Sequence, residues 1–438
     1  MADGLRIGIF GTRGIPAAYG GFETFAEQLG VRLAARGHEV TVFGRSTSVD
    51  PSRHGQKHRG VRLVVLPAPR SKHLETVLHT VRTAWWARAE RFDVALVCNS
   101  ANFPALPLLR RGGARTLLAI DGIESARRKW GFAGRTFYLL AAWLGPRLAD
   151  VVVADCRVIE AHYRERGAKS VEMIAYGAEP PKERGAEMLE RLGVAPGKYV
   201  LYVSRLEPEN NADVVIEAFR SAGVPGNLVV VGDAPYADEY KTRLSALAGG
   251  DGRVRFAGFV FGRGYDELRA HAACYVQATE VGGTHPALLE AMAAGLPVIA
   301  NDIPEHREVL GDAGWYYRKN SSVELAARLR DVLLGDDDVR RARGLAALGR
   351  VRRLYDWDRV TTAYESLAYR VVGKSRPTAA LAEDPDESGD ADEDDRDDDT
   401  PNGLAAEATS GSALLRNCAP DGGAVTPLVG DGRGCRKA

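Results

Sequence analysis

A loop and the start of a helix are encoded in Thr279-Glu280-Val281-Gly282-Gly283-Thr284-His285-Pro286-Ala287-Leu288-Leu289-Glu290-Ala291-Met292. Pro286 suits the first turn of a helix, and Gly295 with Pro297 ends it before an apolar strand. The two glycines let backbone N–H groups approach an anion or a sugar closely, and a helix N-terminus adds partial positive charge. An ordinary strand-to-helix turn could use the same residues. The stretch therefore suggests a polar-ligand site only if other parts of the chain support it.

Short apolar runs alternate with helical patterns on both sides of this stretch, which is typical of parallel sheets wound with helices. The predicted strands are 5–10, 39–43, 61–66, 94–98, 116–120 and 151–154, then 199–204, 227–231, 253–256, 273–277, 297–300 and 314–317. The predicted helices include 22–36, 76–91, 212–220, 236–248, 265–271 and 324–334, and 351–374 is expected to form a final amphipathic helix or helix pair. We therefore expect two Rossmann-like α/β domains, residues 1–180 and 181–357, with 358–374 packing back on the first.

The composition describes a globular protein with an unusual C-terminal segment. The 438 residues exceed one compact core, 45% of them are hydrophobic, and 58 basic residues balance 58 acidic ones. Twelve of the seventeen residues in the run 383–399 are Asp or Glu, so the chain before it is net basic. We predict that residues 375–438 form a disordered acidic tail, and the balanced total charge gives no argument for nucleic acid as a partner.

Cysteines and apolar runs bear on the compartment. The five cysteines are scattered without paired ligand spacing, which argues against a disulfide framework or a zinc site. We expect no signal peptide and no membrane span, because the N-terminus leads straight into a strand and no window of about twenty residues is apolar throughout. A cytoplasmic protein that needs no metal or cofactor is the expectation.

A second candidate loop follows the first strand, from Gly11 to Gly21. Gly20 and Gly21 precede the helix predicted at 22–36, where backbone amides can meet a phosphate or a hydroxyl. The rival interpretation is a dinucleotide fingerprint, which needs a helix directly after G-x-G-x-x-G. The second strand ends without an acidic residue for an adenosine ribose, although Arg45 leaves a phosphorylated ribose open.

Arg205 ends a strand and precedes a helix, so its guanidinium could clamp a diphosphate. A surface arginine paired with Glu207 or Glu209 is the plainer alternative. Val260, in the loop after another strand, could line an apolar slot for a nucleobase, or simply pack in an exposed loop.

Several of these motifs occur together and in order. The runs Gly11-Thr12-Arg13-Gly14-Ile15-Pro16, Gly20-Gly21-Phe22-Glu23-Thr24-Phe25, Arg205-Leu206-Glu207-Pro208-Glu209-Asn210-Asn211 and Gly282-Gly283-Thr284 with Leu288-Leu289-Glu290-Ala291-Met292 resemble glycosyltransferase family 4 of the GT-B fold. Within that family the chain is most similar to the bacterial rhamnosyltransferase-like branch of surface polysaccharide synthesis. The resemblance covers roughly residues 5–372.

The resemblance implies a retaining, metal-independent hexosyltransferase that moves a sugar from a nucleotide diphosphate donor to a glycan or lipid-linked acceptor. It implies catalytic-site roles for Asp121, Arg205 and Glu290, with Arg205 on the diphosphate and Glu290 on the ribose. The implied donor-binding set also contains Gly20, Gly21, Asn210, Val260, Gly282, Gly283, Thr284 and Leu289.

The chain departs from many family members at three positions, all shared with the rhamnosyltransferase-like branch. Gly282 replaces a Glu, and the nearest acid, Glu280, is not assumed to take its role. Asn210 replaces a Lys. Asp121 replaces a His that faces the donor sugar's 6-hydroxyl, so the resemblance favours a 6-deoxy sugar such as rhamnose from dTDP-rhamnose. Asp121 could instead cap the turn that follows it.

Basic and aromatic residues recur at near-helical spacing over 127–147. Such a surface could contact an anionic bilayer at the inner face of the plasma membrane, or it could be a core-facing helix with solvated arginines. Three alternatives for the function stay open: a family 4 transferase using another UDP- or GDP-hexose, a non-catalytic nucleotide-sugar-binding protein, and, more distantly, an NADP-dependent oxidoreductase.

Overall fold

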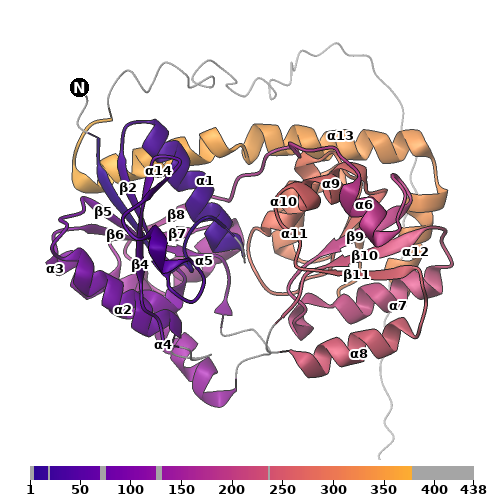
Figure 1. Cartoon of the computed structure of the whole chain (residues 1–438), viewed down its shortest axis with the longest axis horizontal. Coiled ribbons are helices and arrows are strands. Elements are labelled where there is room, and N and C mark those ends of the chain that lie inside the picture. Colours follow the sequence, from indigo (N-terminus) through magenta and orange to yellow (C-terminus); the bar gives the residue numbers. More distant parts are fainter. Residues whose placement is uncertain (1–3, 18–19, 70–74, 125–130, 235–236, 377–438) are drawn as a thin grey trace, which may run out of the picture. The chain divides into compact units, whose positions relative to one another are not determined.

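The computed structural model describes residues 4–17, 20–69, 75–124, 131–234 and 237–376. Residues 1–382 form one compact unit, which contains both sheets (Figure 1). The tail predicted at 375–438 lies outside the described residues, apart from its first two positions.

The first sheet has eight strands in the order β3-β4-β2-β1-β5-β6-β7-β8, all parallel to their neighbours except β3 with β4. The strands are β1 Arg6–Phe10, β2 Glu39–Arg45, β3 Lys57–His58, β4 Val61–Leu66, β5 Val94–Cys98, β6 Arg115–Ile120, β7 Val151–Ala154 and β8 Val171–Met173. The run Val-Ala-Leu-Val-Cys of β5 is buried at every position. A strand covered on both faces needs apolar side chains on both, which is why these strands do not alternate.

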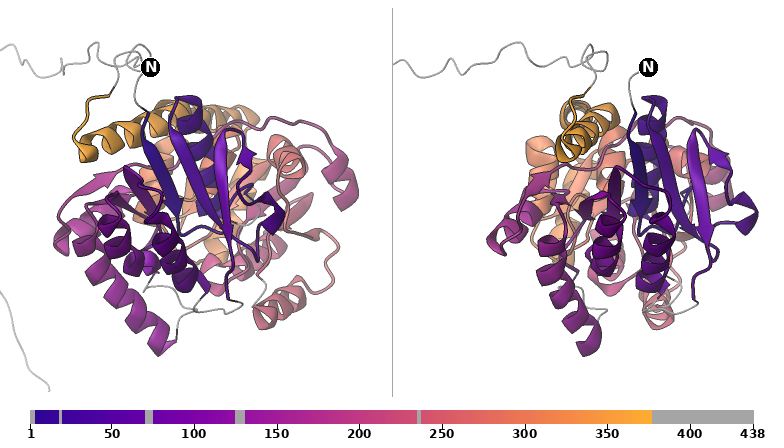
Figure 2. Two further views of the ribbon diagram at one scale, coloured as in Figure 1. Left: turned by 60° about the vertical axis from the view of Figure 1, so that its left-hand side comes forward. Right: turned by 90° about the vertical axis from the view of Figure 1, so that its left-hand side faces the viewer.

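Helices cover this sheet on both faces (Figure 2). They are α1 Gly21–Ala35, α2 Glu75–Ala87, α3 Leu106–Arg111, α4 Phe132–Leu148 and α5 Arg157–Glu165, with short 3₁₀ turns η1 Pro51–Arg53 and η2 Ser100–Ala105. The helix predicted over 76–91 ends earlier, at Ala87.

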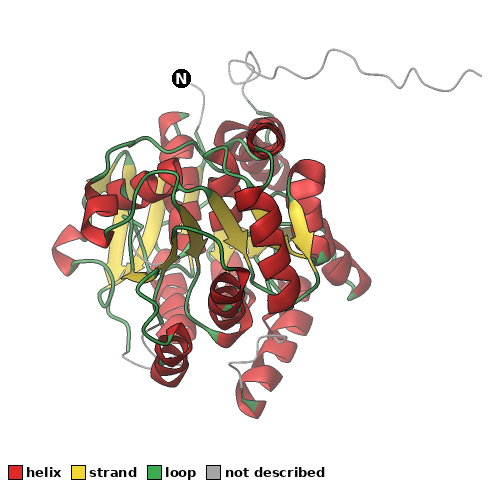
Figure 3. Ribbon diagram, turned by 90° about the vertical axis from the view of Figure 1, so that its right-hand side faces the viewer, coloured by secondary structure: helices red, strands yellow, loops and turns green. Residues whose placement is uncertain are grey.

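The second sheet has six parallel strands in the order β11-β10-β9-β12-β13-β14. They are β9 Tyr199–Val203, β10 Asn227–Val231, β11 Val254–Gly258, β12 Cys274–Gln277, β13 Val298–Asn301 and β14 Trp315–Tyr317. Helices again lie on both sides of the strands (Figure 3). These helices are α6 Glu187–Leu192, α7 Ala212–Ala222, α8 Asp238–Ala248, α9 Arg263–His271, α10 Pro286–Ala293, α11 Pro304–Leu310 and α12 Ser322–Leu334, with 3₁₀ turns η4 Pro208–Asn210 and η5 Gly311–Ala313. The predicted pair of parallel α/β domains is confirmed.

Two C-terminal helices complete the described chain, α13 Asp337–Leu354 and α14 Trp357–Val372. The prediction of a final element from 351 missed most of α13, because the buried residues of this helix are small or few: Gly344, Ala347 and Val351. Asp356 separates the helices, since its carboxylate accepts the Asp358 and Arg359 amides and caps α14.

A buried cluster of polar side chains holds α14 to the first sheet. Glu365 accepts hydrogen bonds from Arg36 Nη1 at 2.9 Å and His38 Nε2 at 3.0 Å, while His38 Nδ1 accepts the Leu5 amide at 3.0 Å. One apolar core runs from Leu5 through Trp357 and Tyr364 and includes residues of both sheets. The boundaries at 180 and 357 therefore stay predictions.

Candidate active site

The order of the strands determines which loops form a crevice. In the second sheet, β9 lies beside β12 while β10 and β13 lie outside them, so the direction of winding reverses between β9 and β12. In the first sheet the reversal lies between β1 and β5. Ligands bind at the carboxyl ends of strands at such switch points. The loops predicted from the sequence follow β1, β9 and β12, at these two positions.

The glycine-rich loop after β12 is bonded to the first sheet. The Gly283 amide donates to the Asp121 carbonyl at 2.9 Å, and the Thr284 amide donates to Asp155 Oδ2 at 2.9 Å. The Thr284 hydroxyl donates to the Asp155 carbonyl. The backbone groups expected to meet a sugar thus contact the residues that directly follow β6 and β7.

Asp155 was not predicted from the sequence. It is 4% exposed. Burial raises the pKa of its carboxyl well above the usual range, the nearby Asp121 raises it further, and the hydrogen bond from Thr284 opposes both effects. The signal was available, because an acid that directly follows the apolar run Val151–Ala154 stands at the carboxyl end of a parallel strand, as Asp121 does.

The two glycines of the loop are required by close packing. A Cβ on Gly283 would lie 2.0 Å from Asp155 Oδ1, and one on Gly282 would lie 2.4 Å from the His285 ring. Thr284 is buried beside them. No larger residue fits at either glycine without moving its neighbour.

Glu290 lies in α10, in a group of polar residues from two helices. Tyr265 of α9 donates its hydroxyl proton to Glu290 Oε2 at 2.8 Å, and the Arg269 guanidinium donates to the Glu290 carbonyl at 3.3 Å. Burial raises the pKa of Glu290, whereas Arg269 and the Tyr265 hydroxyl pull it down. Tyr265 and Arg269 were not predicted. The neighbouring Leu289, implied to bind the donor, is fully buried in the core.

The Arg205 loop is shaped by Asn210. The side-chain amide of Asn210 donates to the Arg205 backbone carbonyl at 2.6 Å. Tyr202 donates its hydroxyl proton to the backbone carbonyl of Asn210 at 2.6 Å. Asn210 is therefore buried, whereas the Arg205 side chain is 35% exposed and lies 3.7 Å from Glu207. The structure thus places Arg205 with one of the carboxylates considered for it and keeps part of its guanidinium accessible.

Val260 and Arg45 are both buried. Val260 is 7% exposed and joins the apolar core, so the structure places it under its loop. Arg45 is 3% exposed and donates to Thr76 Oγ1 at 3.2 Å, with Glu75 at 3.7 Å. A guanidinium packed under α2 in this way does not face an open ribose site.

The loop after β1 lies close to α10. Gly20 directly precedes α1, its carbonyl accepts the Thr24 amide at 3.2 Å, and a Cβ on Gly21 would lie 3.2 Å from Pro286 Cγ. Glu23 steadies the loop by accepting the Arg13 amide at 2.9 Å. The structure therefore brings together the two glycine-rich loops that the sequence singled out separately.

Glu280 is held by residues that follow β14. Its Oε2 accepts a hydrogen bond from Asn320 Nδ2 at 2.6 Å and lies 3.9 Å from Lys319 Nζ, and its side chain is 6% exposed. Asn211 and Asn301 both donate to Asn320 Oδ1. This amide network fixes Glu280 against the 318–320 turn.

The described residues contain no group of three His, Cys, Asp or Glu side chains that could hold a metal ion. None of the helices in this part of the chain is long and apolar enough to cross a membrane. Independence of metals and cofactors stays a prediction.

Solved structures with this architecture define the class. The chain superimposes on sucrose-phosphate synthase from Thermosynechococcus elongatus with a TM-score of 0.73 and 21% identity, over 85% of this chain and all of that one. It superimposes on the Anabaena protein HepE in complex with UDP-glucose with a TM-score of 0.67 and 18% identity, over 83% and 99%. The fold is that of the GT-B class.

Sequence comparisons give the family. Residues 20–177 match the glycosyl transferase 4-like domain, and residues 190–347 match the glycosyl transferases group 1 model. The chain is 26% identical to a GDP-mannose-dependent alpha-(1-6)-phosphatidylinositol monomannoside mannosyltransferase of Mycolicibacterium smegmatis, over 79% of this chain and 93% of the relative. Its match to the O-antigen chain mannosyltransferase B of Escherichia coli, at 26% identity, covers 40% of this chain and 46% of that protein. The chain is a GT-B glycosyltransferase with the paired domains of family 4.

Proposed function

We propose that the protein is a retaining glycosyltransferase that moves a sugar from a nucleotide diphosphate donor to a glycan or lipid-linked acceptor in surface polysaccharide synthesis. The proposal rests on one observation. The Gly282–Thr284 loop, the Gly20–Gly21 loop and Asp121 after β6 lie together at the carboxyl ends of two parallel sheets. Names of relatives that transfer mannose, and of a neighbour solved with UDP-glucose, support a nucleotide sugar as the ligand.

Departure of a nucleoside diphosphate leaves negative charge, which preorganised donors stabilise most strongly in a cleft that excludes water. Arg205 supplies a partly exposed guanidinium for this charge, and the N-terminus of α10 supplies oriented backbone groups. Glu290 has a carboxylate oriented by Tyr265 and is the residue we assign to the ribose.

Rhamnose from dTDP-rhamnose is the donor we propose. The support is the resemblance at Asp121, where a His that would face a 6-hydroxyl is absent, and at Gly282. One of the relatives named above is described as GDP-mannose-dependent, so a UDP- or GDP-hexose is the competing donor.

A donor panel tests the proposal. Purified protein is incubated with dTDP-rhamnose, UDP-glucose, GDP-mannose and NADP, first in thermal-shift measurements and then with a lipid-linked acceptor while free nucleoside diphosphate is measured. We expect dTDP-rhamnose to raise the melting temperature most, because a ligand that binds only the folded state stabilises it, and to be consumed. Binding without consumption of any donor would favour a non-catalytic binding protein, and a shift with NADP alone would favour an oxidoreductase.

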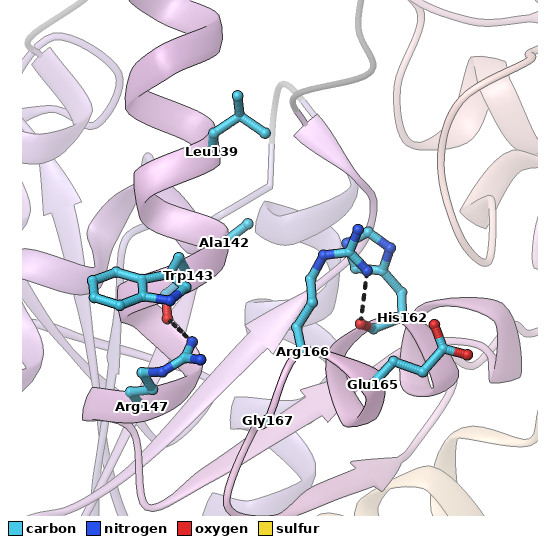
Figure 4. A pocket seen from close by; sticks show the side chains of 8 residues that line it. All are labelled: Leu139, Ala142, Trp143, Arg147, His162, Glu165, Arg166 and Gly167. Carbon is cyan, nitrogen blue, oxygen red and sulfur yellow. Dashed lines mark hydrogen bonds between the residues drawn. The ribbon is translucent and has the colours of Figure 1, made fainter.

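We further propose that α4 lies against the inner face of the plasma membrane, where a lipid-linked acceptor would be found. A pocket of about 500 Å³ lies between the C-terminal halves of α4 and α5 (Figure 4). Trp143 and Leu139 line it and are 54% and 56% exposed, and Arg147 lies 4.8 Å from the Trp143 ring. An exposed aromatic ring beside a half-buried guanidinium on one helix suits the interface of an anionic bilayer. Residues 127–130 of the predicted contact lie outside the described residues.

Co-sedimentation with vesicles of phosphatidylglycerol and phosphatidylcholine tests this contact. Trp143→Ala should reduce the bound fraction on anionic vesicles several-fold, with little binding of either protein to pure phosphatidylcholine. Trp85→Ala is the matched control, because Trp85 is 66% exposed on α2. Equal binding of the Trp143 variant and the original protein would contradict the contact.

A further inference from the structure

The segment Gly282–Thr284 of the loop after β12 contains no carboxylate of its own. Gly282 has no side chain, and the Glu280 carboxylate is bonded to Asn320 and lies near Lys319. A site that orients a sugar through its hydroxyl groups needs fixed hydrogen-bond acceptors, which carboxylates supply best. An acid for this loop would have to come from elsewhere in the fold.

Asp155 reaches the loop from the end of β7. Its Oδ2 accepts the Thr284 amide at 2.9 Å, and its backbone carbonyl accepts the Thr284 hydroxyl. Two contacts to one residue fix both the position and the rotation of Thr284. Asp155 therefore determines the conformation of the loop from the opposite sheet.

The other carboxylate oxygen of Asp155 has no hydrogen-bond partner within the part of the chain that the structure describes. This oxygen points at the backbone of Gly283, where a Cβ would lie only 2.0 Å away. An unsatisfied buried acceptor costs about 1–3 kcal/mol, and more when it is charged. Such an atom beside a candidate ligand loop is explained if a ligand hydroxyl pairs with it.

A second carboxylate also joins the two sheets, but it comes from the second sheet and contacts the first. Glu308 of α11 accepts the Arg157 amide at the start of α5, with both carboxylate oxygens at 2.9 Å. Glu308 thus joins the same two sheets without touching the Gly282–Thr284 loop. Asp155 therefore holds the Gly282–Thr284 loop, whereas Glu308 only holds the two sheets together.

We propose that Asp155 supplies, from the first sheet, the carboxylate that the Gly282–Thr284 loop lacks: it is a positioning residue that fixes Gly283 and Thr284, and its Oδ1 pairs with a hydroxyl of the donor sugar. The inference rests on the proposed function and identifies the part of the donor, the sugar, that this side chain serves. Because the contact joins two sheets, the sugar site is complete only when they are together.

Calorimetric titration of the full-length protein tests the assignment. The probes are the nucleotide sugar of the panel that binds most tightly and the matching free nucleoside diphosphate. Asp155→Ala should weaken the binding of the nucleotide sugar at least tenfold, because the loop contacts the sugar. The affinity for the free nucleoside diphosphate should change by less than twofold. Asp155→Asn should recover part of the loss, since an amide oxygen can still accept the Thr284 amide. If the melting temperature of each Asp155 variant is equal to or above that of the original protein, weaker binding is not caused by misfolding.

Glu308→Gln is the control for the contact between the two sheets. It should weaken the binding of both probes equally or of neither. An unchanged preference for the nucleotide sugar in Asp155→Ala would overturn the inference, as would the same selective loss in Glu308→Gln. If the original protein binds no nucleotide sugar, the proposed function itself fails. If it binds the nucleotide sugar no more tightly than the nucleoside diphosphate, the proposed function still stands, but the proposed contact between Asp155 and the sugar is refuted.

Discussion

Gly21 at the start of α1 lies against Pro286 at the start of α10, so closely that a Cβ on Gly21 would lie 3.2 Å from Pro286 Cγ. The two residues are 265 positions apart, in helices that follow strands of different sheets. Their contact joins the two glycine-rich loops that follow β1 and β12.

Gly21→Ala should separate these loops by a few tenths of an ångström and reduce donor turnover. A displacement of this size in a closed site is expected to lower kcat/KM about tenfold, with the melting temperature nearly unchanged. Gly349→Ala in α13 is the control, since a Cβ there meets nothing within 4 Å and should be stabilising by up to about 1 kcal/mol. Unaltered turnover in the Gly21 variant would show that the loops do not close on the donor.

Arg205→Ala should lower donor kcat/KM by about a hundredfold, since it removes the cation assigned to the leaving diphosphate. The fold should be intact, because the side chain is 35% exposed and its loop is held by the hydrogen bond from the Asn210 side-chain amide to the Arg205 carbonyl. Arg243→Ala, which breaks an ion pair of a 69% exposed arginine with Asp213, provides the comparison. Kinetics of donor consumption check this, and equal rates for the two variants would refute the role of Arg205.

Glu365→Ala should reduce the free energy of unfolding by about 3 kcal/mol, because it leaves Arg36 and His38 without their buried partner. Hydrogen bonds from these two residues hold the pKa of Glu365 below its usual value even though burial opposes them. Glu172→Ala, which breaks a pair with Arg370 whose side chains are 40% and 60% exposed, should cost less than about 1 kcal/mol. Urea denaturation of both variants measures the difference.

Acid should destabilise the protein through His306 and His79. Burial lowers the pKa of both imidazoles to about 4, and Arg45 contributes at His79. Between the unfolded value near 6.5 and the folded value near 4, the unfolded chain binds more protons, so stability is lost as pH falls. Each histidine contributes a slope of about 1.4 kcal/mol per pH unit within this window.

His306→Gln should remove one such slope when unfolding free energies at pH 7 and pH 5 are compared with those of the original protein. Asp155, Glu290 and Glu308 have raised pKa values and act in the opposite direction, so the comparison between variants, and not the absolute slope, is the test. A parallel pH dependence for the two proteins would contradict the assignment.

Much of the fold followed from local pattern. The strands Val61–Leu66, Val94–Cys98 and Val151–Ala154 were predicted to the residue. The last two are continuous apolar runs bounded by polar residues, as expected of strands buried on both faces. Predicted helix ends differed more, since local contacts decide where a helix stops. The helix α13 was mostly missed because it packs through Gly344 and Ala347, which give no strong apolar periodicity.

The sequence by itself determined that two parallel sheets exist and that loops containing Gly20, Arg205 and Gly283 follow their strands. Chain order and residue type carry that information, because each strand–loop–helix unit is local. Only the tertiary structure decided which side chains share a site. It brought Asp155 to Thr284 across 129 positions, placed Tyr265 on Glu290 and turned Glu280 toward Asn320. These pairings depend on the register of two sheets and on the packing between them, which no short stretch of sequence encodes.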